Sequence, residues 1–135
     1  MFDKSTRVLV VDDMATMRKL VMKVCADLGF TDVQEAADGE KAWSIINNDP
    51  KPIGLVISDW NMPHLTGLDL LKRVRADKRY AGTPFLLVTA EAESSQVTDA
   101  VKAGVDNYIV KPFTAATLTE KLEAIHKKRG GAAAA

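Results

Sequence analysis

The chain has 135 residues, with 18 Lys and Arg against 18 Asp and Glu, so its formal net charge is zero, and it contains one cysteine. This length predicts a single domain, the balanced charge argues against a nucleic-acid or membrane binder held by its overall field, and one cysteine excludes an internal disulfide framework. Hydrophobic residues make up 47% of the chain, without the long apolar run of a membrane helix or signal peptide. We therefore expect a soluble, cytoplasmic globular domain.

Five short apolar runs predict β-strands. Residues 8–11, 55–57 and 85–88 are continuously apolar, which is typical of strands covered on both faces of a sheet. Residues 33–36 are partly polar and residues 108–110 form a short run, which predicts edge strands.

Apolar residues recur at helical spacing between these runs. Met17, Val21, Val24 and Leu28 predict a first helix that ends at Gly29. The same spacing predicts four more helices, around residues 42–46, 70–74, 97–101 and 118–125. Thr66 and Thr114 are the expected N-caps of the third and fifth helices. Five strands, each followed by a helix, predict an α/β fold with a parallel sheet covered on both faces.

Polar residues follow four of the predicted strands, and such sheets bind ligands at the carboxyl ends of their strands. These residues are Asp12-Asp13, Asp59, Thr89-Ala90 and Lys111-Pro112. If the first and third strands are neighbours, three carboxylates converge, and their mutual repulsion costs stability. A hard cation such as Mg2+, which prefers oxygen ligands, removes that cost, and the single lysine suits a phosphoryl group.

A lone aspartate after a strand is usually a helix cap or a solvated loop residue. Two adjacent aspartates after one strand and a third after another make that interpretation much weaker. A carboxylate can act as a nucleophile and form an acyl phosphate. Because Asp59 stands alone at its strand end, while Asp12 and Asp13 are free to hold metal, we expect Asp59 to be the nucleophile.

The same residues lie within motifs of a known family. The four motifs are Val10-Val11-Asp12-Asp13, Ser58-Asp59-Trp60-Asn61-Met62-Pro63, Val88-Thr89-Ala90-Glu91-Ala92 and Val110-Lys111-Pro112-Phe113. Over residues 7–127 the chain resembles the receiver domains of two-component response regulators, most of all the CheY-like chemotaxis regulators. The resemblance implies a single-domain, flavodoxin-like doubly wound sheet of five parallel strands in the order 2-1-3-4-5. It assigns residues 5–129 to the receiver domain and residues 130–135 to a short C-terminal tail.

The resemblance also implies the roles of the acidic residues. Asp59 corresponds to the aspartate that accepts a phosphoryl group from a histidine kinase. Asp13 and Asp59 would supply carboxylate ligands to Mg2+, the backbone carbonyl of Asn61 would supply another, and Asp12 would reach the metal through water.

The remaining site residues follow from the resemblance in the same way. Lys111 would pair with the phosphoryl oxygens, and Pro112 would follow a cis peptide bond. Thr89 would be the switch residue, whose movement lets the ring of Tyr108 turn inward. The residues expected to border the site are Met14, Trp60, Asn61, Ala90, Glu91 and Pro112.

The function implied is a signalling module rather than an enzyme, although it would promote its own phosphoryl transfer and hydrolysis. The expected partners are a CheA-like histidine kinase and a flagellar motor switch protein, with a phosphatase as a further candidate. We expect a monomer that binds neither nucleic acid nor membrane and carries no output domain. The alternative within this class is a phosphate sink or phosphorelay shuttle.

Two other classes share parts of this pattern. A Mg2+-dependent aspartyl-phosphate phosphatase commonly places an Asp-x-Asp nucleophile after the first strand, whereas Asp12 and Asp13 have no spacer. A flavin-binding protein of similar architecture needs a phosphate-cradling loop there. The segment at residues 12–15 has no glycine and would repel a phosphate, which excludes the flavin class.

Overall fold

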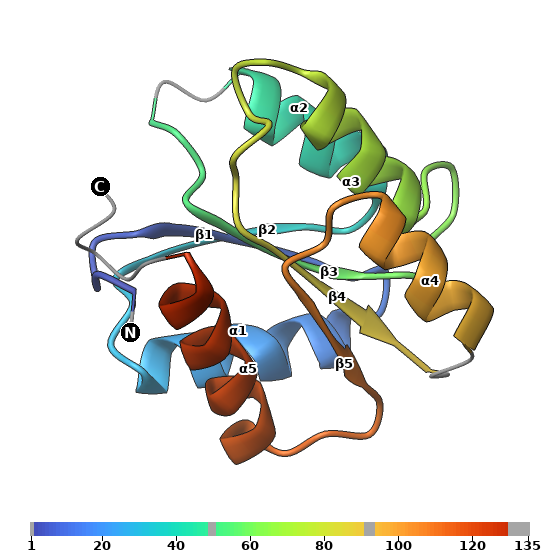
Figure 1. The fold of residues 1–135 in the computed structure, drawn as a ribbon. Helices are drawn as coiled ribbons and strands as arrows, with labels where there is room; N and C mark the ends of the chain where they lie inside the picture. The colour runs from blue at the N-terminus through green and yellow to red at the C-terminus, as the bar shows by residue number, and fades with distance from the viewer. Residues whose placement is uncertain (1, 49–50, 91–93, 130–135) are drawn as a thin grey trace.

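The computed structural model describes residues 2–48, 51–90 and 94–129. Within these residues, strands and helices alternate along the chain (Figure 1). The strands are β1 (Arg7–Val11), β2 (Asp32–Ala36), β3 (Leu55–Asp59), β4 (Phe85–Thr89) and β5 (Asn107–Val110). The helices are α1 (Ala15–Asp27), α2 (Gly39–Asn48), α3 (Gly67–Ala76), α4 (Ser94–Lys102) and α5 (Ala115–Lys128). Every strand and helix expected from the apolar pattern is present.

The strands form one parallel sheet in the order β2-β1-β3-β4-β5. This confirms the order that the family resemblance implied. The two polar or short runs, β2 and β5, are the edge strands, and the apolar runs β1, β3 and β4 lie inside the sheet. All five residues of both β3 and β4 are buried, as expected for strands with helices on both sides.

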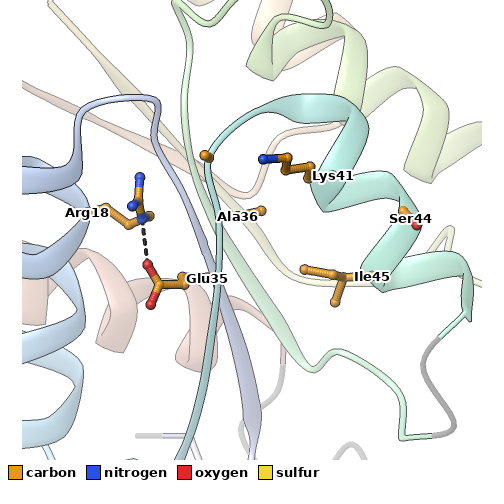
Figure 2. Close-up of a pocket in the computed structure, with 7 residues that line it drawn as sticks. Arg18, Glu35, Ala36, Lys41, Ser44 and Ile45 are labelled. Atoms are coloured by element: carbon orange, nitrogen blue, oxygen red, sulfur yellow. Dashed lines mark hydrogen bonds and ion pairs between the residues drawn. The ribbon is translucent and has the colours of Figure 1, made fainter.

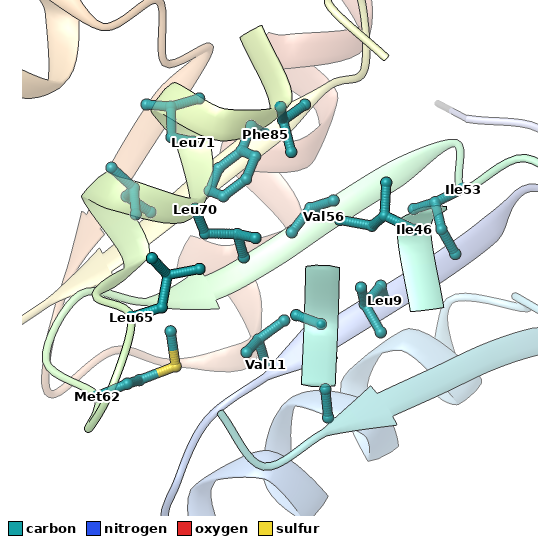
Figure 3. Packing of buried hydrophobic residues seen from close by; sticks show 14 of the residues in the cluster. Leu9, Val11, Ile46, Ile53, Val56, Met62, Leu65, Leu70, Leu71 and Phe85 are labelled. Atoms are coloured by element: carbon teal, nitrogen blue, oxygen red, sulfur yellow. The ribbon is translucent and has the colours of Figure 1, made fainter. Parts of the chain in front are cut away.

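The sheet separates two hydrophobic cores, because alternate residues of a strand face opposite sides. Val8 and Val10 pack with α1 and α5 on one side. Leu9 and Val11 pack on the other side with α2, α3 and α4 (Figures 1 and 3). Cys25 lies fully buried in the α1–α5 core, and burial raises the pKa of its thiol to about 12.

The helix ends follow local sequence signals. The hydroxyl of Thr66 accepts a hydrogen bond from the Asp69 N–H at 3.1 Å. The hydroxyl of Thr114 likewise accepts from the Thr117 N–H at 3.1 Å, so both expected N-caps are confirmed. At the end of α1, Gly29 has φ +98°, a left-handed conformation that glycine adopts without steric cost.

An ion-pair cluster ties together the end of the sheet opposite the strands' carboxyl ends. The carboxylate of Asp106, in the loop before β5, accepts from the Phe85 N–H at 2.8 Å. It also accepts from Arg75 of α3 at 3.0 Å and from two nitrogens of Arg129 at 2.6 and 2.9 Å. The cluster therefore joins α3, β4, β5 and the last turn of α5 through one carboxylate.

No helix among the described residues combines the length and apolarity that crossing a membrane requires. The helix α5 ends at Lys128 with Arg129 as its C-cap. The predicted tail, residues 130–135, lies outside the described residues.

Candidate functional site

The polar residues at the carboxyl ends of the strands lie together because neighbouring strands are in register. Val11 of β1 pairs with Ser58 of β3, so the residues that follow these two positions are adjacent. Thr89 pairs with Val110, which brings the end of β4 next to the end of β5. The site is therefore assembled from four segments that are far apart in the sequence.

Asp12, Asp13 and Asp59 form an acidic triad. Each contributes one carboxylate oxygen to a group whose members all lie within 4.8 Å of one another. Asp12 is 3% exposed and Asp59 is 5% exposed, whereas Asp13 is exposed. Two of the three carboxylates are thus held largely away from water, where their repulsion is least screened.

Burial dominates the electrostatics of Asp59. It raises the pKa of this carboxyl above the ordinary value of 3.8, and the negative charge of Asp12 raises it further. The ammonium of Lys111 opposes this, with Nζ lying 3.3 Å from Asp59 Oδ1 and 3.6 Å from Asp12 Oδ2. Among the described residues, this one ammonium pairs with two of the three carboxylates of the triad, so the triad keeps an excess of negative charge.

This donor set fits Mg2+. The ion takes oxygen ligands and is usually held by one or two carboxylates together with waters and phosphate oxygens. The acidic triad supplies converging carboxylate oxygens, and its uncompensated charge would be neutralised by a divalent cation. The exposed position of Asp13 leaves one side of the triad open to solvent.

Lys111 directly follows β5, and its side chain reaches Asp12 and Asp59. Its backbone N–H donates to the Thr89 carbonyl at 2.8 Å, and its side chain is 18% exposed. The Lys111–Pro112 bond is cis, as the resemblance implied. Pro112 itself is exposed at the edge of the site.

The loop between β1 and α1 is fixed by hydrogen bonds to Asp12. Oδ1 of Asp12 accepts from the N–H of Met14 at 2.9 Å, and Met14 itself is 58% exposed. The Asp12 carbonyl accepts from Arg18 of α1 at 2.8 Å. Nothing in the sequence marks Arg18 as a site residue, because it occupies an ordinary polar position of an amphipathic helix.

Glu35 in turn holds Arg18. Arg18 Nε donates to Glu35 Oε1 at 2.7 Å, and the pair lines one wall of a cavity of about 410 Å³ beside β2 (Figure 2). Lys41 and Ile45 of α2 line the opposite wall. The Arg18–Glu35 pair thus connects the edge strand to the loop that carries Asp12 and Asp13.

Backbone hydrogen bonds fix the loop that follows β3 beside the site. Trp60 is half-buried; its N–H donates to the Val88 carbonyl at 2.8 Å, and its carbonyl accepts from the Gly67 N–H at 2.9 Å. A Cβ atom at Gly67 would overlap the carbonyl oxygen of Asp59. Glycine is therefore required at position 67, and nothing in the sequence pattern singles this residue out. Asn61 is exposed, two residues beyond Asp59.

The end of β4 links the site to α4. Thr89 is 3% exposed, and its hydroxyl donates to Oε1 of Gln96 at 3.1 Å. Nothing in the linear sequence pattern of α4 marks Gln96 as a site residue. Ala90 is exposed, and the predicted site residue Glu91 lies outside the described residues.

Tyr108 lies on the edge strand β5, away from the acidic triad. It is half-buried and packs against the α2–α3–α4 core, and Lys121 Nζ lies 5.4 Å from its ring centroid. Both residues line a groove of about 390 Å³ between β5 and α5. The structure thus places Tyr108 beside a surface groove.

Comparisons with known proteins agree with this geometry. The sequence profile of the response regulator receiver domain matches residues 8–123. The chain is 47% identical over 126 residues to the chemotaxis protein CheY-3 of Vibrio cholerae, covering 93% of this chain and 95% of that protein. It is 46% identical over 125 residues to the chemotaxis protein CheY of Pseudomonas aeruginosa, covering 93% and 99%. Its structure is similar to that of the chemotaxis response regulator CheY4 of Vibrio cholerae, with a TM-score of 0.82, 33% identity, and coverage of 89% of this chain and 98% of that one.

Proposed function

This chain belongs to the response regulator receiver domain family and is of the CheY chemotaxis type, and from that premise we propose that it accepts a phosphoryl group on Asp59 from a histidine kinase. Residues 5–129 form the receiver domain in this proposal, and residues 130–135 form a tail. The observation that carries the proposal is a buried carboxylate, Asp59, between two further carboxylates and the ammonium of Lys111.

In the proposed reaction a carboxylate oxygen of Asp59 attacks the phosphorus of a phosphohistidine. A P–O bond forms to Asp59 while the P–N bond breaks, and the imidazole leaves with the bonding electron pair. The ammonium of Lys111, 3.3 Å from Asp59 Oδ1, is placed to pair with a phosphoryl oxygen. The hydroxyl of Thr89 is the donor for another.

We assign the acidic triad and the backbone carbonyl of Asn61 as the groups that would hold Mg2+. When bound, the ion would neutralise negative charge on the phosphoryl oxygens. The open side of the site at Asp13 gives the phosphodonor access, while Trp60, Ala90 and Met14 border the pocket. Glu91 is assigned to this border from the family resemblance alone.

Phosphorylation would act as a charge switch. It adds about 1.5–2 negative charges and three strong acceptor oxygens, and a hydrogen bond to a charged group contributes about 1.5–3 kcal/mol. Thr89 would turn toward the phosphoryl group, and Tyr108 would then change its position beside the β5–α5 groove. The resulting population shift alters the affinity of this face for a target.

The partners proposed are a CheA-like histidine kinase and a flagellar motor switch protein, with a phosphatase that assists hydrolysis. The protein would act in the cytoplasm as a monomeric signalling module rather than as an enzyme with an external substrate. A phosphate sink or phosphorelay receiver would use the same pocket without a motor target. Binding to a motor-switch peptide with and without beryllium fluoride separates the two, because equal affinity in both states favours the sink.

Mass spectrometry after incubation with acetyl phosphate and Mg2+ tests the phosphoacceptor. We expect the wild type to gain one phosphoryl group, which is lost in base, and Asp59→Ala to gain none. Asp27→Ala, which changes an exposed aspartate of α1, is the matched control and should behave as the wild type does. Removal of Mg2+ with a chelator should abolish the adduct, and an adduct that persists in Asp59→Ala would move the nucleophile elsewhere.

A further inference from the structure

A side-chain hydrogen bond joins the acceptor site to α4. The hydroxyl of Thr89, the last residue of β4, donates to Oε1 of Gln96 at 3.1 Å. Thr89 is 3% exposed, and Gln96 is half-buried in the first turn of α4. Water is therefore a poor competitor for this bond.

The helix α4 is lightly held elsewhere. Among its described side chains only Ala100 is buried, and Val101, a large apolar residue, is 63% exposed. A helix that buries so little apolar surface opens locally at a lower free-energy cost than the core elements of a fold. The hydrogen bond from Gln96 in its first turn to the buried end of β4 is one of the contacts that position this helix.

The Thr89 hydroxyl has one proton to donate. Here that proton is given to Gln96 Oε1, yet a phosphoryl group on Asp59 requires the same proton. Asp59 pairs with Val88, the residue before Thr89, across the β3–β4 ladder, so both acceptors are near the same strand end. Only one of the two bonds can be made at a time.

We propose that Gln96 is a positioning residue for the switch: its amide oxygen holds the Thr89 hydroxyl in the unphosphorylated state and competes for it with the phosphoryl group. This inference rests on the proposed phosphorylation of Asp59. When Thr89 turns to the phosphoryl group, α4 loses this hydrogen bond to β4 in the same step. Gln96 thereby raises the free energy needed to turn Thr89 toward the phosphoryl group, and it connects that movement to α4.

The expected effect of removing the Gln96 acceptor follows from the net free energy of one neutral hydrogen bond. Removing the Gln96 acceptor should shift the equilibrium of Thr89 toward the phosphoryl group by about two- to tenfold. The apparent affinity for a phosphoryl mimic rises by the same factor, because the competent state is more populated before binding.

Titration with beryllium fluoride in saturating Mg2+, followed by Trp60 fluorescence, measures this affinity. Gln96→Met keeps the length of the side chain without the amide oxygen, and should bind the mimic about two- to tenfold more tightly than the wild type. Gln96→Glu offers a charged and stronger acceptor, and should bind it more weakly. Ser95→Glu, an exposed neighbour on α4, controls for added charge and should stay within about twofold of the wild type.

A double-mutant cycle with Thr89→Val shows whether Gln96 acts through the hydroxyl. In the Thr89→Val background the change Gln96→Met should have no effect, whereas a general effect of α4 packing would persist there. Wild-type affinity in Gln96→Met, or an effect that persists without the hydroxyl, would overturn the inference. If the wild type showed no fluorescence response to beryllium fluoride that depends on Asp59, the proposed function would be wrong, and this inference would fail with it.

Discussion

Replacing Asp106 with alanine should destabilise the domain at the end of the sheet remote from the acidic triad. The Asp106 side chain is 8% exposed and accepts hydrogen bonds from Phe85, Arg75 and Arg129. The Phe85 N–H begins β4, and the two guanidinium groups come from α3 and the end of α5. Among the described residues, Asp106 is the one carboxylate that pairs with either arginine.

The magnitude can be worked from these contacts. An unmade bond at the buried Phe85 N–H costs about 1–3 kcal/mol, and removing one partner of a buried ion pair costs about 3–5 kcal/mol in total. Arg75 is 17% exposed and keeps three backbone carbonyls as acceptors, while Arg129 is 33% exposed and can turn to water. We therefore expect a loss of about 3 kcal/mol, a large part of the roughly 5–15 kcal/mol that stabilises a domain.

Urea unfolding measured by tryptophan fluorescence gives the free energy of unfolding, provided that the m-value is unchanged. Asp106→Asn keeps an acceptor for Phe85 and should lose only about 1–2 kcal/mol. Asp27→Ala removes the exposed partner of Lys23, 3.5 Å away, and should change stability by less than about 0.5 kcal/mol. If Asp106→Ala cost no more than Asp27→Ala, the cluster would not stabilise the fold and the reasoning would be wrong.

Three further changes probe the site itself. In Gly67→Ala the new Cβ would collide with the carbonyl oxygen of Asp59, so we expect a loss of roughly 1–3 kcal/mol and a lower yield of phosphoryl adduct; Gly82→Ala, which enters open space, should change neither. Burial and the charge of Asp12 raise the pKa of Asp59 above 3.8, so the folded state holds this proton more tightly than the unfolded chain, and the stability contributed at low pH is lost as pH rises through the folded pKa. Asp59→Asn should therefore exceed the wild type in stability at pH 7 but not at pH 3, and a difference that does not vary with pH would contradict this. Arg18→Ala removes the donor to the Asp12 carbonyl and should weaken Mg2+ binding, measured by calorimetry, by about two- to tenfold; unchanged affinity would show that Arg18 does not position the acidic triad.

The local part of the structure was predictable from the sequence because its causes are local. Continuous apolar runs marked the buried strands β1, β3 and β4, and the spacing of apolar residues marked the helices. Parallel strands end at the same edge of a sheet, so Asp12, Asp13, Asp59 and Lys111 could be expected at one edge, and in one cluster if their strands were neighbours. The order of the strands came from the family resemblance, since the alternation of elements leaves several orders open.

The tertiary structure alone decided which side chains act on those residues. Gln96 meets Thr89 and Arg18 meets the Asp12 carbonyl only because a helix packs at one depth and rotation against a strand end. Gly67 is required because the start of α3 lies so close to the end of β3 that a Cβ atom there would overlap the carbonyl oxygen of Asp59. A sequence pattern records periodicity and strand polarity, which act between neighbours along the chain. It does not record the rotamers and close approaches that depend on how distant segments pack, and the hydrogen bonds that tune the site arise there.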